Sequence, residues 1–90
     1  MMTDNNKTED AQAWINKGIA LHDLGKCDKA IECFDKVIEL DPRSTEGYEY
    51  KSAVLCNLKK YEEALECFDK IIELDPEDYE SYYSKGLFFM

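Results

Sequence analysis

The apolar residues between positions 30 and 38 recur with the spacing of an amphipathic helix. They lie at i, i+1, i+4, i+7 and i+8, and they are Ala30, Ile31, Phe34, Val37 and Ile38. This spacing places them on one face of a helix. The helix is expected to end at Asp41, because the proline that follows disfavours helical geometry in the residue before it.

A second apolar stripe precedes this one and predicts a partner helix. Its inward face is predicted to consist of Trp14, Gly18, Leu21 and Leu24. Asp10 is a suitable N-cap for the start of that helix. The stretch LGKCD separates the two helices, and its Gly25 can adopt the positive φ that a tight turn requires. The pattern therefore predicts a helix-turn-helix unit.

The same unit recurs 34 residues later. Residues 11–44 and 45–78 are identical at fifteen of 34 positions, including Glu32–Lys36 against Glu66–Lys70. Ser44 and Asp78 repeat the capping role expected of Asp10. A fixed period of this length is typical of stacked repeats. The second turn, LKKYE, lacks glycine, so a residue with a side chain must serve there.

Small residues are expected where the two helices of a unit meet. Gly18 and Ala30 would allow close approach, while Trp14 and Phe34 fill the space beside them. Larger side chains at Ala30 or Ala64 should overpack this contact, at a cost of about 1–3 kcal/mol.

These positions resemble the tetratricopeptide repeat, whose pattern is Trp-x2-Leu-Gly-x2-Tyr, Ala-x3-Phe and Pro over 34 residues. The first repeat matches it at Trp14, Gly18, Ala30, Phe34 and Pro42, and the second at Ala64, Phe68 and Pro76. Lysine replaces the pattern leucine in both repeats. The resemblance implies an all-α fold, a short right-handed α-solenoid of five helices. The expected divisions are a polar tail over 1–10, repeats over 11–44 and 45–78, and the first helix of an incomplete third repeat over 79–90.

The resemblance also implies a scaffold that binds a peptide or helix in a concave groove lined by the first helix of each repeat. The candidate groove residues are Gln12, Ile15, Asn16, Ile19, Glu46, Glu49, Tyr50, Ala53, Asn57 and Tyr83. Ile15 and Ile19 could instead pack on the neighbouring helix, and Tyr50 and Tyr83 could cover the next layer. The glutamates could be a solvated face without a ligand.

One subfamily grips acidic chaperone tails with a clamp of lysine, asparagine and arginine. At the clamp positions this chain has Ile15, Ile19, Tyr50, Glu80 and Ser84. An acidic tail would meet no cation at these positions and at least two carboxylates in the groove, so the expected partner is an apolar or basic segment of a protein.

The net charge and the cysteines limit which partners, metal sites and cellular compartments are expected. The net charge of −9 disfavours nucleic acid and anionic membranes as partners. No Cys-x-x-Cys pair and only one histidine are present, so no metal site or cofactor is expected. No nucleophile has a base at recognisable spacing, so an enzyme is not expected either. Free thiols and the absence of a secretory pattern favour the cytoplasm.

The C-terminal residues predict a second, alternative role. Leu87, Phe88 and Met90 lie on an apolar last helix that no further helix is expected to cover. Stacked units bury their apolar faces only against neighbours. The chain could therefore form a homo-oligomer through this helix, it could exchange a helix with another copy, or it could be part of a longer array.

Overall fold

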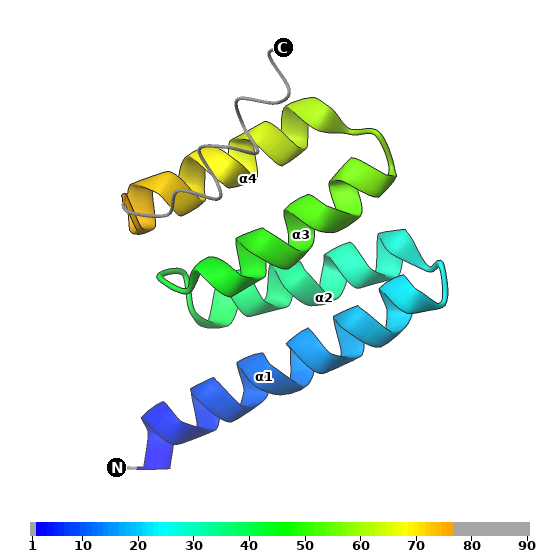
Figure 1. The fold of residues 1–90 in the computed structure, drawn as a ribbon. Helices are drawn as coiled ribbons and strands as arrows, with labels where there is room; N and C mark the ends of the chain where they lie inside the picture. Colours follow the sequence, from blue (N-terminus) through cyan, green and yellow to red (C-terminus); the bar gives the residue numbers. More distant parts are fainter. Residues whose placement is uncertain (1, 77–90) are drawn as a thin grey trace.

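The computed structural model describes residues 2–76, with side chains described from residue 10 onward. This part of the chain forms four helices and no strand: α1 (Met2–Asp23), α2 (Cys27–Leu40), α3 (Thr45–Asn57) and α4 (Tyr61–Leu74). Successive helices lie side by side, from α1 at one end to α4 at the other (Figure 1). The all-helical prediction is confirmed for these residues. The expected fifth helix, over 79–90, lies outside them.

The first helix is longer than predicted. It begins at Met2, so the expected start at Asp10 is wrong, and residues 2–10 are helical where a polar tail was expected. This segment contains neither proline nor glycine before Gly18, so nothing in it interrupts a helix that has formed downstream.

The two helices of the first repeat approach closely at Gly18, as predicted. A Cβ atom on Gly18 would lie 2.5 Å from a ring carbon of Phe34. Phe34 and Ala30 are almost fully buried. The absence of a side chain at Gly18 therefore makes room for the Phe34 ring between α1 and α2.

The turns use the backbone geometry that the sequence indicates. Gly25 has a φ of 80°, and in the second turn Lys59 adopts a φ of 62°. A residue with a side chain thus adopts the left-handed conformation in the second turn, as predicted from the absence of glycine there. At the start of α3 the Ser44 hydroxyl accepts a hydrogen bond from the Glu46 amide at 3.3 Å, which confirms Ser44 as the N-cap.

The two repeats are joined by the packing of α2 on α3. The Tyr50 ring stacks on Phe34 with centroids 5.3 Å apart. Val54 is fully buried in a cluster with Ala30 and Phe34. The Lys51 ammonium lies 2.7 Å from the Asp35 carboxylate. Apolar contacts and one ion pair therefore fix how the second repeat sits on the first.

The predicted inward position of Leu24 is wrong. Leu24 follows the end of α1 and is 71% exposed. Its counterpart one repeat later, Leu58, packs on the cluster of Ala30, Phe34 and Val54, because α2 lies beside α3. Among the described residues, no helix lies beside the corresponding side of α1.

Candidate peptide-binding groove

The groove candidates lie on α1 and α3, which contact each other although α2 separates them in sequence. We call the contact between α1 and α3 the seam. Ile19 on α1 and Tyr50 on α3 both pack against the same two apolar clusters, which contain Val37 and Phe34. Each remains half-buried. One aliphatic and one aromatic side chain, from the first helices of the two repeats, therefore share apolar neighbours and keep part of their surface exposed.

Ile15 has a different position from the other candidates. It is 3% exposed and packs with Ala11 and Val37. The alternative of packing on the neighbouring helix thus describes Ile15 in this structure. Its side chain is part of the apolar core beneath Ile19 and Tyr50, and almost none of its surface is accessible to a ligand.

The other described candidates are exposed and mostly polar: Gln12, Asn16, Glu46, Glu49, Ala53 and Asn57. The Gln12 amide nitrogen donates a hydrogen bond to the Asn16 side-chain oxygen at 3.2 Å. Two carboxylates and no lysine or arginine occur among the groove candidates on α1 and α3. The exposed candidates are therefore polar or acidic except for Ala53, and the apolar candidates Ile15, Ile19 and Tyr50 are buried or half-buried. Tyr83 lies outside the described residues, as do Leu87, Phe88 and Met90.

One contact across the seam was not predicted. The side chains of His22 and Asn57 form a hydrogen bond that links the C-terminal ends of α1 and α3. The sequence contains a signal for it, because the two residues occupy adjacent positions of successive repeats. A polar pair thus bounds the seam at the end opposite to Gln12.

The four thiols are free, and burial makes three of them poor nucleophiles. Burial raises the pKa of Cys67 to about 11, and burial also raises the pKa values of Cys33 and Cys56. A protonated thiol is a weak nucleophile and a weak metal ligand at neutral pH. In the described part of the chain, no group of three or more histidine, cysteine or carboxylate side chains could hold a metal ion.

Comparison with known proteins agrees with the repeat geometry. Residues 11–44 and residues 45–78 each match the tetratricopeptide repeat family. The chain belongs to this family. Tetratricopeptide repeats are generally non-catalytic modules for protein–protein interaction. The two matches have the bounds of the two helical hairpins that the 34-residue period defines.

Individual relatives share the repeats over different lengths. Superkiller protein 3 of Saccharomyces cerevisiae is 36% identical over 47 residues, which are 52% of this chain and 3% of that protein. The second tetratricopeptide domain of Spaghetti (RPAP3), solved with the HSP90 peptide SRMEEVD, has a TM-score of 0.85 at 24% identity, covering 97% of this chain and 80% of that chain. YrrB, described as having an unusual peptide-binding site, has a TM-score of 0.77 at 26% identity, covering 96% and 43%.

In the described residues, every helix is too short or too polar to cross a bilayer.

Proposed function

We propose that this tetratricopeptide protein is an interaction scaffold that binds an apolar or basic segment of a partner protein along the α1–α3 seam. The observation that supports the proposal is that half-buried Ile19 and Tyr50 pack on the same apolar clusters, while Glu46 and Glu49, on the same helix as Tyr50, are exposed. Tyrosine at a partly covered apolar surface is a typical anchor for a partner.

The electrostatics of the seam favour the same class of ligand. Glutamates on α3 would attract lysine or arginine, although exposed ion pairs contribute only about 0–1 kcal/mol each. The affinity must therefore come mainly from apolar side chains packed on Ile19 and Tyr50. The acidic peptide bound to the Spaghetti domain has the opposite charge, and the likeness to that domain supports the fold alone.

A peptide titration tests the proposal. Fluorescein-labelled helical peptides of leucine and lysine, and matched peptides of leucine and glutamate, are titrated with the protein. We expect the lysine peptide to bind at least about tenfold more tightly. Because a basic peptide is attracted to any acidic protein, the test depends on two variants with the same charge change.

Ala53→Arg and Ala20→Arg provide this pair. Both alanines are exposed. Ala53 is one of the groove candidates on α3, whereas Ala20 is the α1 counterpart of Val54, which is buried against α2. We expect Ala53→Arg to weaken binding of the lysine peptide and Ala20→Arg to leave it within about twofold. Equal effects of the two variants would contradict a ligand at the seam.

Self-assembly through Leu87, Phe88 and Met90 remains the alternative proposal, and these residues lie outside the described part of the chain. The cytoplasm remains the proposed compartment, supported by four free thiols.

A further inference from the structure

The outer side of α1 occupies the same repeat positions as the side of α3 that packs on α2. The α3 positions are Gly47, Lys51, Val54 and Leu58, and their counterparts in and after α1 are Ala13, Lys17, Ala20 and Leu24. Gly47 and Val54 are buried under α2. All four counterparts are exposed. We call these four residues the end face.

The packing of α2 on α3 shows which chemistry fits such a face. Asp35 pairs with Lys51, Phe34 packs on Val54, and Ile38 lies against Gly47, where a Cβ atom would be 2.9 Å from its side chain. A helix that covers this side therefore carries an apolar residue, a carboxylate one position later, and a second apolar residue three positions after the carboxylate. Lys17 on the end face is the counterpart of Lys51.

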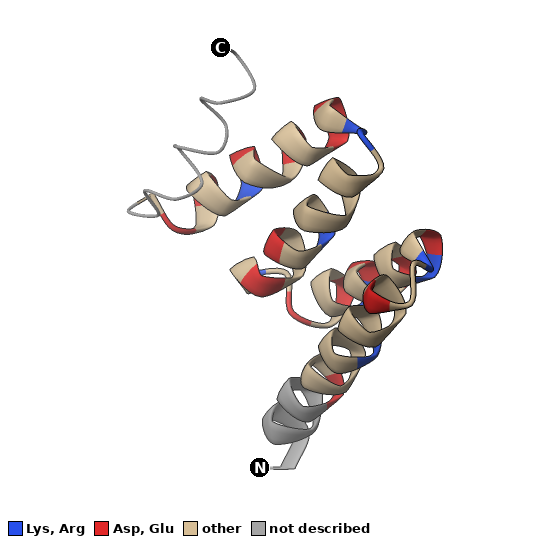
Figure 2. Cartoon of the chain, turned by 45° about the vertical axis from the view of Figure 1, so that its right-hand side comes forward, with Lys and Arg blue, Asp and Glu red and all other residues tan. Residues whose placement is uncertain are grey.

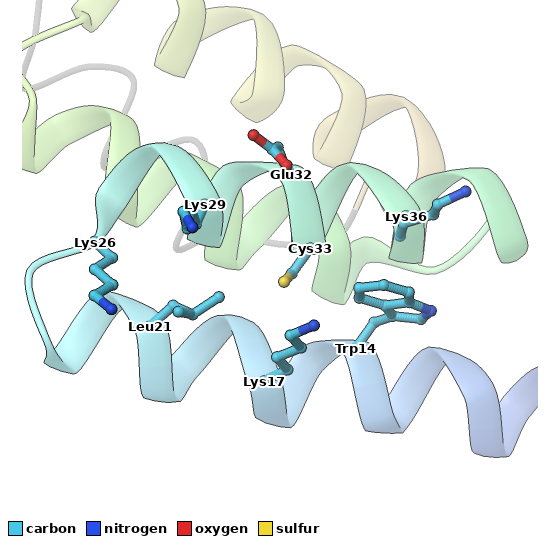
Figure 3. Close-up of a pocket in the computed structure, with 8 residues that line it drawn as sticks. All are labelled: Trp14, Lys17, Leu21, Lys26, Lys29, Glu32, Cys33 and Lys36. Carbon is cyan, nitrogen blue, oxygen red and sulfur yellow. The ribbon is translucent and has the colours of Figure 1, made fainter.

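The charge beside the end face is opposite to that of the chain as a whole. A hollow of about 430 Å³ lies between α1 and α2. Trp14, Lys17 and Leu21 reach it from α1 and Cys33 from α2 (Figure 3). Its charged lining residues are Lys17, Lys26, Lys29, Lys36 and Glu32. Glu32 points away from α1 in this view.

The corresponding hollow in the second repeat has the opposite balance. Two lysines and four carboxylates line it, and acidic residues recur along α4 (Figure 2). In a chain of net charge −9, the lysines of the first repeat therefore form a local basic region next to an exposed leucine, Leu24. Such a region attracts a carboxylate-bearing ligand that the rest of the surface repels.

We propose that the end face of α1, together with the lysines of the adjacent hollow, docks an acidic amphipathic helix of a partner protein. The apolar stripe of that helix covers Ala13, Ala20 and Leu24, and one of its carboxylates pairs with Lys17. This surface is distinct from the α1–α3 seam, where the proposed ligand is apolar or basic. The two ligands therefore occupy different sides of α1 and differ in charge.

Tryptophan fluorescence tests the proposal with a defined probe. The probe is a peptide of residues 60–76 with blocked ends and serine in place of its cysteine. It has six acidic residues and two lysines, and it repeats the required pattern at Phe68, Asp69 and Ile72. Trp14 is the only tryptophan of the chain, and the peptide has none. We expect a saturable change in Trp14 emission that weakens as salt is added. No change at millimolar peptide would overturn the proposal.

A matched pair of charge reversals locates the site. Lys36 and Lys70 occupy the same position of α2 and α4, and each pairs with a glutamate three residues later, at 3.6 Å and 3.8 Å. Only Lys36 borders the basic hollow. We expect Lys36→Glu to weaken probe binding at least about fivefold and Lys70→Glu to change it less than about twofold. Equal effects would mean that the peptide responds to net charge alone, which contradicts a site.

The two arginine variants separate this proposal from the seam. Ala20→Arg should weaken peptide binding, because its long side chain lies where the apolar stripe of the peptide would pack, and Ala53→Arg should leave binding within about twofold. This is the reverse of the result expected for the lysine peptide. Circular dichroism establishes that both variants fold. Light scattering of the protein alone completes the test. Self-association that Ala20→Arg removes would make a second copy the occupant and overturn the claim of a separate partner.

Discussion

At the scale of the residue, the contact between Gly18 and Phe34 sets the distance between α1 and α2. Gly18→Ala would place a methyl group 2.5 Å from a ring carbon that is itself almost fully buried. We expect a loss of about 1–3 kcal/mol in the free energy of unfolding, because the ring has little free space into which it can move. Urea denaturation followed by circular dichroism measures this loss.

Ser52→Ala is the control for that substitution, since Ser52 is the counterpart of Gly18 and already carries a Cβ atom. Its hydroxyl donates a hydrogen bond to the Glu49 carbonyl at 2.7 Å within the same helix. Its removal should change stability by less than about 1 kcal/mol. A Gly18→Ala protein more stable than the parent would show that helix propensity exceeds the steric cost.

The buried thiol of Cys67 gives a prediction for alkaline pH. Burial raises its pKa to about 11 from 9.0, so the folded state holds this proton more tightly than the unfolded state. The corresponding stability is present below pH 9 and is lost as the pH rises through about 11. Unfolding of Cys67→Ala should therefore depend less on pH between 9 and 11 than unfolding of the parent. A Cys27→Ala variant is the control, and identical pH profiles for Cys67→Ala and the parent would contradict the prediction.

Single residues also show where sequence reasoning reaches its limit. The close approach of Gly18 and Phe34 could be predicted from the repeat pattern, because that contact lies within one hairpin. The exposure of Leu24 could not, because it depends on whether another helix lies beside α1. The burial of Ile15 could not be decided for a related reason, since both a ligand and Val37 can satisfy an apolar side chain.

At the scale of the element, the ion pair between Asp35 and Lys51 is the polar part of the α2–α3 joint. Burial lowers the pKa of Lys51, but the hydrogen bond to Asp35 and its charge outweigh burial and raise that pKa above 10.5. The stabilisation is therefore fully present below pH 10.5 and is lost as the pH rises through the raised pKa.

A double-mutant cycle with Asp35→Asn and Lys51→Met measures this pair. We expect a coupling of about 0.5–1 kcal/mol, because half of the Asp35 side chain and a quarter of the Lys51 side chain are exposed. The same cycle on Lys70 and Glu73, which are more exposed, should give a smaller value. Equal couplings would mean that the pair does not hold α2 on α3.

The start of α3 is the clearest helix boundary. Ser44→Ala removes the acceptor for the Glu46 amide and should destabilise the protein by about 1 kcal/mol. Ser44→Asp should retain the cap and stay close to the parent. Thermal unfolding of the three proteins tests this expectation, and an unchanged midpoint in Ser44→Ala would contradict it.

Helix positions inside the two repeats were predictable because each helix carries its own apolar stripe and its own end signals. The start of α1 was not predictable. A good capping residue such as Asp10 marks the first turn of a helix only when the residues before it favour a non-helical conformation. Residues 2–9 have no proline or glycine that would impose one.

At the scale of the whole molecule, the two sides of α1 have opposite chemistry. The groove candidates on α3 include Glu46 and Glu49, which are exposed, whereas the end face contains Lys17 and adjoins a hollow lined by three further lysines. The basic ligand proposed for the seam and the acidic helix proposed for the end face should therefore bind without competing with each other.

Light scattering after size exclusion tests the remaining whole-molecule prediction, self-association through Leu87, Phe88 and Met90. If the C-terminal helix makes an oligomer, Phe88→Glu should reduce the mass to that of a monomer at all concentrations, while Ala20→Arg should not. A parent protein that is monomeric throughout would contradict the prediction.

The joint between α2 and α3 also has a consequence for how this chain can grow. Residues 66–70 repeat residues 32–36, so Asp69 stands where Asp35 stands in the joint. An in-frame duplication of residues 45–78 would thus bring a new copy of Lys51 to Asp69 in the geometry that already joins α2 to α3. The added unit would carry the same joint residues as the existing one. The stability of such arrays is roughly the sum of the stabilities of the repeats and of the interfaces between neighbouring repeats. A duplication of this kind would lengthen the protein with residues that already form the α2–α3 joint.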